Sequence, residues 1–99
     1  MIRHIVLFKL KAFDTSEQKE AKMQEIKTAL ENLAPLIPEL KRIEAGINRN
    51  ENEQFDISLL TEFNSMEDLH TYAIHPEHVA VGKIVREVLE ARACVDSVI

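Results

Sequence analysis

The chain opens with a short stretch rich in branched, aromatic and other apolar residues, which is the pattern of a β-strand. The predicted strand covers residues 2–11. One of its faces carries His4, Val6, Phe8 and Leu10, and the other carries Ile5, Leu7, Lys9 and Lys11. Both faces are apolar through the middle of the strand, so both need to be covered in the folded protein.

The spacing of apolar residues then changes to three or four, which is the period of a helix. A capping-box spacing, either Asp14 with Glu17 or Thr15 with Gln18, predicts where this helix begins. Pro35 and Pro38 are predicted to end this helix. The apolar stripe of this helix consists of Met23, Ile26, Leu30, Leu33 and Ile37.

Two further strands are predicted over residues 40–47 and 54–63, joined by a polar hairpin loop at residues 48–53. In the second of these strands the odd-numbered residues are predicted to face the core. They are Phe55, Ile57, Leu59, Thr61 and Phe63.

The remainder of the chain predicts two helices and a last strand. A short helix capped by Asn64 or Ser65 should run to about Ile74, and Pro76 suits the first turn of the next helix. The inward side of the short helix is predicted to carry Met66, Leu69, Tyr72 and Ala73. The last strand, residues 92–98, places Cys94, Asp96 and Val98 on one face and Ala93, Val95 and Ser97 on the other.

The element order β-α-β-β-α-α-β predicts one α+β domain over residues 1–99. Its expected form is a ferredoxin-like sandwich, in which helices cover one face of a four-stranded antiparallel sheet. The other face would expose Ile5, Leu7, Leu60 and Val95. Because a large exposed apolar patch is unusual on a monomer, we expect a homodimer in which a second copy covers it.

Composition excludes several other partners. The net charge is −5 and no basic stripe is present, so nucleic acid is not an expected partner. The apolar runs are too short to span a bilayer, and the first residues do not resemble a signal peptide, so a membrane partner is not expected either. Cys94 is the single cysteine and is expected to be a reduced, small buried hydrophobe in a cytoplasmic protein.

The richest chemistry lies in the stretch from Tyr72 to His78, which holds a phenol, two imidazoles and a carboxylate. An imidazole at His78 could remove a proton next to a carbonyl group, and the Tyr72 hydroxyl could hold the carbonyl oxygen. The alternative is a structural turn, in which His75 and His78 bind free backbone groups at the helix junction. A metal site that includes His4, His70, His75 and His78 is the least favoured hypothesis, because Pro76 breaks the helical register.

A second pair of polar residues lies on the outer strands. His4 and Asp96 both take the helix-facing parity, and the first and last strands are neighbours in a ferredoxin-like sheet. The two side chains are therefore expected to pair inside the core, because a buried charge requires a partner.

These residues carry a resemblance to a known family. The opening strand from His4 to Lys11, the Tyr72-x-x-His75-Pro76-Glu77-His78 segment and the late Asp96 resemble the stress-responsive dimeric A/B barrel family. The resemblance covers essentially the whole chain and implies a homodimeric α+β barrel. In a plant polyketide cyclase of this family, which closes its substrate by an aldol condensation without a cofactor, the essential Tyr and His match Tyr72 and His78. Its further His and Asp match His4 and Asp96, whereas Ile57 stands where that enzyme has another His.

Two functions remain open on the sequence alone. In the first, a site between helices and sheet binds or converts a small carbonyl compound, without a metal or other cofactor. Its catalytic residues would be His78 and Tyr72, and its ligand-binding residues would be His4, Val6, Phe8, Leu59, Leu69, His75 and Asp96. In the second, the protein is a non-catalytic, stress-related structural homodimer.

Overall fold

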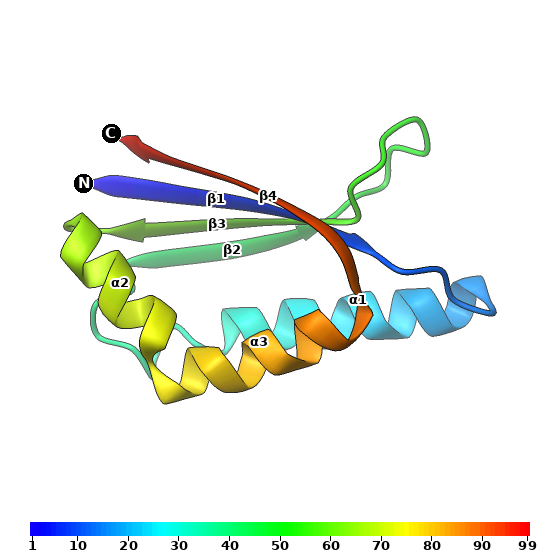
Figure 1. The fold of residues 1–99 in the computed structure, drawn as a ribbon, viewed down its shortest axis with the longest axis horizontal. Helices are drawn as coiled ribbons and strands as arrows, with labels where there is room; N and C mark the ends of the chain where they lie inside the picture. Colours follow the sequence, from blue (N-terminus) through cyan, green and yellow to red (C-terminus); the bar gives the residue numbers. More distant parts are fainter.

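The computed structural model describes residues 1–99, and its seven elements occur in the predicted order. They are β1 (Ile2–Leu10), α1 (Ser16–Glu31), β2 (Arg42–Ile47), β3 (Ile57–Phe63), α2 (Met66–Ile74), α3 (Pro76–Val88) and β4 (Leu89–Val98). The strands form one sheet in the order β2-β3-β1-β4, and each neighbouring pair is antiparallel. All three helices lie on the same side of this sheet (Figure 1). The predicted ferredoxin-like α+β fold is therefore confirmed.

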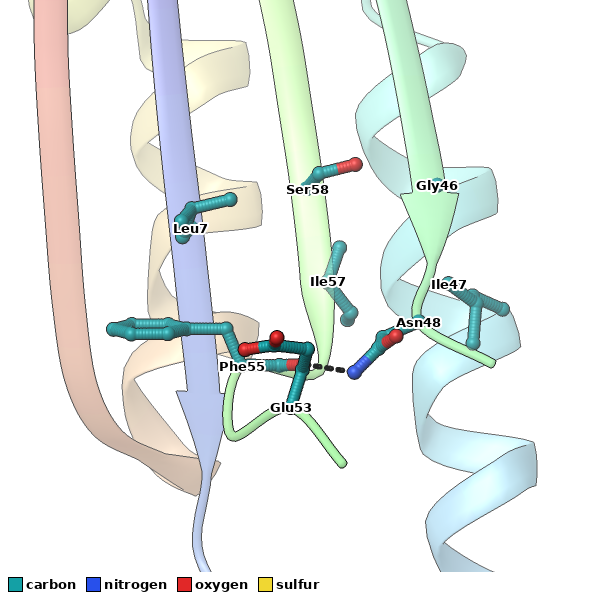
Figure 2. A pocket seen from close by; sticks show the side chains of 8 residues that line it. All are labelled: Leu7, Gly46, Ile47, Asn48, Glu53, Phe55, Ile57 and Ser58. Atoms are coloured by element: carbon teal, nitrogen blue, oxygen red, sulfur yellow. Dashed lines mark hydrogen bonds between the residues drawn. The ribbon is translucent and has the colours of Figure 1, made fainter. Parts of the chain in front are cut away.

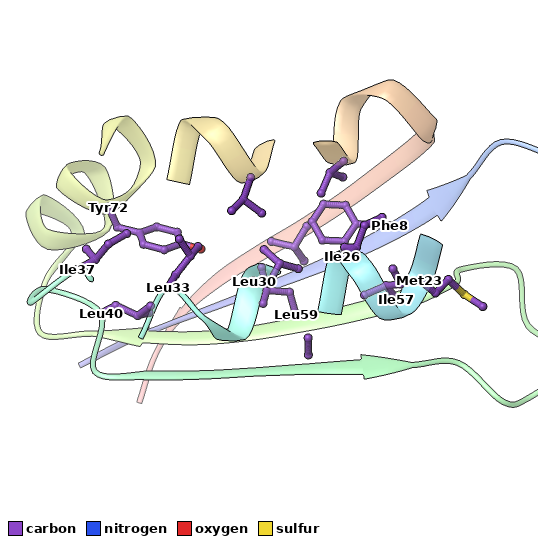
Figure 3. Close-up of a cluster of buried hydrophobic side chains, with 14 of the residues drawn as sticks. Phe8, Met23, Ile26, Leu30, Leu33, Ile37, Leu40, Ile57, Leu59 and Tyr72 are labelled. Carbon is purple, nitrogen blue, oxygen red and sulfur yellow. The ribbon is translucent and has the colours of Figure 1, made fainter. Parts of the chain in front are cut away.

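The hydrophobic core lies between the sheet and the helices. Strands contribute side chains of the parity that the alternation predicts, including Val6, Phe8, Ile57 and Leu59. Figure 3 shows Met23, Ile26 and Leu30 of α1 packed toward these strand residues. The stripe continues beyond the end of α1, because Leu33 and Ile37 are also buried although they lie in the following turns.

Side-chain caps fix where two helices begin. The Thr15 hydroxyl accepts a hydrogen bond from the backbone N–H of Gln18 at 3.1 Å, which decides between the two predicted capping pairs. The Ser65 hydroxyl accepts one from the N–H of Asp68, also at 3.1 Å. Each bond satisfies a backbone donor that has no partner within its helix.

Some predicted boundaries were wrong. β3 begins at Ile57 rather than at residue 54, and Asp56, just before it, binds the end of β1. Its backbone N–H donates to Phe8 O, and its carboxylate accepts from the N–H of Leu10, both at 2.8 Å. β4 begins at Leu89, directly after α3, so no loop separates the last helix from the last strand.

Two of the side chains predicted to point inward from α2 are exposed. Met66 is 52% exposed, and Ala73 is also exposed, whereas Leu69 and Tyr72 are buried. The helix lies at one end of the sheet (Figure 1), so only a narrow side of it meets the core.

The opposite face of the sheet has no helix over it (Figure 1). A cross-strand row of apolar residues runs over it, because Leu60 of β3 and Val95 of β4 both pair with Ile5 of β1. A hollow of about 330 Å³ lies beside this row, with Leu7, Phe55 and Ser58 among its walls (Figure 2). At the edge of the face Glu62 binds Arg3 at 2.9 Å and Arg42 at 3.5 Å, so its buried carboxylate is paired.

Burial predicts unequal effects for two neighbouring leucines. Leu33 is 2% exposed and Leu36 is 48% exposed, although they lie three residues apart. Leu33→Ala should lower the free energy of unfolding by about 2–5 kcal/mol, because it removes buried contacts and leaves a cavity. Leu36→Ala, the matched control, should change it by no more than about 0.5 kcal/mol. Urea denaturation measures both values, and equal losses would contradict this packing.

Candidate functional site

Two adjoining hollows lie between the helices and the sheet. The inner hollow has a volume of about 220 Å³ and apolar walls that include Val6, Phe8 and Leu59. The outer hollow has a volume of about 370 Å³ and includes Leu69 in its wall. The two share four lining residues, which are His4, Tyr72, His78 and Arg92. These four residues therefore mark the place where the two hollows adjoin.

Tyr72 combines an apolar setting with a free polar group. Its ring packs against Phe63 at a centroid distance of 5.0 Å and against His78 at 4.4 Å. The residue is 1% exposed, yet its hydroxyl has no hydrogen-bond partner in the protein. Burial raises the pKa of this hydroxyl to about 12, so it keeps its proton and remains a hydrogen-bond donor. A buried donor without a partner is costly, and a ligand oxygen would satisfy it.

His78 has its two ring nitrogens in different roles. Its Nδ1 lies 2.9 Å from Ala73 O, a carbonyl that can only accept, so Nδ1 carries a proton and donates it there. The Nε2 atom of the neutral ring is then left with a free lone pair. Burial is the main cause that lowers the pKa of His78, and electrostatic interaction with His4, Arg86 and Arg92 lowers it further. The Ala73 carbonyl acts in the opposite direction but does not outweigh burial. His78 is thus held in its neutral, proton-accepting form.

His75 was predicted to bind the ligand, but it borders neither hollow. Its Nδ1 accepts a hydrogen bond from the backbone N–H of Glu77 at 3.1 Å and so caps α3. Its own N–H donates to Tyr72 O and closes α2. For His75 the structural-turn alternative is the one that the structure supports, because the break before Pro76 leaves backbone groups that need partners.

His4 and Asp96 form the predicted pair. They are direct partners in the β1–β4 register, and His4 Nδ1 contacts Asp96 Oδ1. The expected location inside a closed core was wrong, because the side chains are 12% and 32% exposed. β4 is the edge strand, and the pair lines the wall of the outer hollow.

Cys94 was expected to be buried, but it is exposed on β4 beside this pair. Its Sγ lies 3.4 Å from His4 Nδ1 and donates to Asp96 Oδ1 at 3.6 Å. Partial desolvation of the thiol group and the Asp96 carboxylate raise the pKa of Cys94 and outweigh the opposite effect of Arg92, which disfavours a thiolate nucleophile. Ligand atoms of His4, Cys94 and Asp96 lie within 4.8 Å of one another and are the set that could hold a metal ion. Because Cys94 and Asp96 meet the same nitrogen of His4, the three do not form a Cys-His-Asp relay.

Sequence reasoning missed two cationic residues of the site. Arg86 of α3 lines the inner hollow, and Arg92 of β4 lines both hollows. The sequence could have indicated Arg92, because residue 92 has the same strand parity as Cys94 and Asp96 and therefore lies on the same face of the last strand. Arg86 lies on the polar side of its helix, and nothing in its periodicity distinguishes it from a solvent-facing residue.

Comparison with known proteins places the chain in a family. The sequence model described as "Stress responsive A/B Barrel Domain" matches residues 2–99. The chain belongs to this family. The stress responsive A/B barrel protein described here is 32% identical to olivetolic acid cyclase from Cannabis sativa over 92 residues, which cover 90% of this chain and 87% of the cyclase.

Solved structures agree with the family assignment. A dimeric protein with a ferredoxin-like fold from Bacteroides fragilis has a TM-score of 0.91 and 46% identity, covering 97% of this chain and 93% of that chain. A hydroxynitrile lyase from Passiflora edulis has a TM-score of 0.81 at 19% identity, covering 99% of this chain and 92% of that one. At that identity the second likeness shows the fold alone. None of the helices is long and apolar enough to cross a membrane.

The lowered pKa of His78 predicts how stability depends on pH. The pKa lies below its ordinary value of 6.5 in the folded protein, so the unfolded chain takes up this proton at higher pH. The stability that His78 contributes should be complete above pH 6.5 and should be lost as pH falls from there through the folded pKa. Urea unfolding at a series of pH values measures this loss.

The variant His78→Gln is the control, because the difference between it and the original protein isolates the titration of one ring. Nuclear magnetic resonance of the His78 ring protons gives the folded pKa directly. A value at or above 6.5 would show that burial does not dominate at this site.

Proposed function

We propose that this family member binds a small carbonyl compound between its helices and its sheet. The observation that carries the proposal is the meeting of two unsatisfied groups in one apolar hollow. One is the buried Tyr72 hydroxyl, which has no partner, and the other is the free Nε2 of His78. Polar groups that converge on an apolar pocket are typical of binding and catalytic sites.

The two groups have complementary roles in such chemistry. The neutral His78 accepts the proton from the carbon next to the carbonyl, and the Tyr72 hydroxyl donates a hydrogen bond to the oxygen on which negative charge develops. The enolate carbon then attacks a second carbonyl of the same molecule, and the protonated ring returns its proton to the new alkoxide. Atoms balance without an oxidant or a further reactant. These steps are an intramolecular aldol addition, and loss of water from the resulting alcohol would complete an aldol condensation.

Similarity to olivetolic acid cyclase supports the reaction type, and a difference at one position bears on the substrate. Ile57, where the resemblance implies another histidine, is 1% exposed and packs in the core between β1 and β2. Ile57 does not border the inner hollow, so position 57 contributes no imidazole to the site. We therefore expect the substrate to differ from that of the cyclase.

A ligand screen tests the site. Small aliphatic and aromatic carbonyl compounds should raise the melting temperature of the original protein by mass action. Tyr72→Phe and His78→Ala should abolish this rise, because each removes one of the two polar contacts. His75→Asn is the matched control, since asparagine also caps a helix and the residue lies outside both hollows.

The outcome decides between the two functions. Stabilisation that is lost in the Tyr72 and His78 variants but kept in the His75 variant supports the carbonyl site. If no compound stabilises the original protein, the site is not a ligand site and the non-catalytic structural dimer is the better function.

We also propose that the protein is a homodimer whose partner covers the open face of the sheet. The apolar row through Leu60, Ile5 and Val95 and the adjoining hollow (Figure 2) lack cover within one chain. The similar protein from Bacteroides fragilis is described as dimeric. A symmetric partner would bury the same patch on both chains.

Val95→Lys tests the proposed dimer. Val95 is 63% exposed in one chain, so a lysine there should fold well but should place a charge in the interface. Sedimentation equilibrium should give twice the chain mass of 11.3 kDa for the original protein and close to that mass for the variant. Val79→Lys, on the helix side, is the control and should remain dimeric. An original protein that sediments as a monomer at micromolar concentration would exclude the dimer.

A further inference from the structure

Two arginines at the inner hollow have no acidic partner. The chain has five arginines, which are Arg3, Arg42, Arg49, Arg86 and Arg92. The first three each form an ion pair with a glutamate. Arg86 and Arg92 form none, and both line the inner hollow.

The charge around the inner hollow is opposite in sign to that of the whole molecule. The chain carries a net charge of −5, yet none of the residues that line this hollow is acidic. Its titratable lining groups are His4, Tyr72, His78, Arg86 and Arg92. Asp96 is the one acidic residue that lines the adjoining outer hollow, and it is already in contact with His4. The two guanidinium groups are therefore not neutralised by the protein.

Local geometry places one guanidinium against the wall of the hollow. Gly82 precedes Arg86 by one helical turn and lines the same hollow. A methyl group built at Gly82 would lie 3.2 Å from Arg86 Nη1. The absence of a side chain at Gly82 thus allows the Arg86 side chain to lie along α3.

The remaining walls are apolar. Val6 and Phe8 of β1, Leu59 of β3 and Val85 of α3 line the inner hollow together with Leu30 and Val81. Its volume of about 220 Å³ is below the roughly 300–1,000 Å³ of drug-sized ligand pockets, so it suits a short apolar group. A ligand that matches both parts of the hollow has an apolar tail and an anionic head.

We propose that the inner hollow binds a short-chain carboxylate, with its tail among the apolar walls and its carboxylate on Arg86 and Arg92. A guanidinium offers two parallel N–H donors that match the two oxygens of a carboxylate. The inference rests on the proposed function and narrows it to carbonyl compounds that also carry a carboxylate, such as short keto acids. The carboxylate at the arginines would orient the chain of the compound relative to Tyr72 and His78.

Binding of matched eight-carbon probes tests the proposal. Octanoate, octanol and octyl phosphate carry the same tail with a carboxylate, a neutral or a phosphate head. Isothermal titration calorimetry at low salt should show that octanoate binds about tenfold or more tightly than octanol, as charged hydrogen bonds predict. Added salt should weaken the binding of octanoate, because it screens the attraction between the carboxylate and the guanidinium groups.

Charge-removing variants locate the head group. Arg86→Gln and Arg92→Gln should each weaken octanoate about tenfold and leave octanol unchanged. Lys83→Gln is the matched control, because Lys83 is an exposed cation of α3 without an ion pair and does not line the hollow. It removes the same charge and should leave octanoate binding unchanged. Arg86→Lys, which keeps the charge but not the two parallel donors, should fall between the original protein and Arg86→Gln.

The outcomes separate this inference from the proposed function. If octanol binds as tightly as octanoate and both are lost in Tyr72→Phe, the hollow is a ligand site but the carboxylate proposal is wrong. It is also wrong if Lys83→Gln weakens octanoate as much as Arg86→Gln, or if octyl phosphate binds more tightly. If neither these probes nor the carbonyl compounds bind, both proposals fail.

Discussion

The central strand β1 sets the constraint on which the rest of this structure depends. It pairs with β3 on one side and β4 on the other, and both of its faces are apolar through the middle. The helices cover one face of β1 and bury Val6, Phe8 and Leu10. On the other face Ile5 and Leu7 have only strand neighbours beside them, so the fold is left with a second surface to bury. One strand therefore accounts both for the packed core and for the proposed dimer.

The helix break at Pro76 builds the candidate site. Pro76 ends α2 and begins α3, and His75 supplies the caps that this junction needs. The change of direction brings His78 of α3 back against Tyr72 of α2, with Ala73 O holding its Nδ1. The same break that costs backbone hydrogen bonds thus fixes the ring state of His78 and leaves its second nitrogen free.

Burial and charge then divide the polar groups by role. Tyr72 keeps its proton because its setting is apolar, and His78 stays neutral for the same reason. Asp96, in the wall of the outer hollow, is occupied by His4 and Cys94, and no carboxylate lines the inner hollow. The uncompensated charge at the site is positive, in a protein that is acidic as a whole.

The sequence by itself determined the element order, the antiparallel sheet, the parity of each strand and the contact between His4 and Asp96. The elements and their parity follow from periodicity and from local breakers such as Pro76, which act over a few residues and are visible in the chain. The contact between His4 and Asp96 follows from that parity together with the strand order of the predicted ferredoxin-like sheet. Tertiary structure alone decided that His75 caps a helix, that Cys94 is exposed, that Met66 leaves the core and that Arg86 reaches the hollow. Each of these depends on where an element ends relative to its neighbours, because a side chain at the edge of a sheet or at a helix junction meets groups from distant parts of the chain. No pattern within one element carries that information.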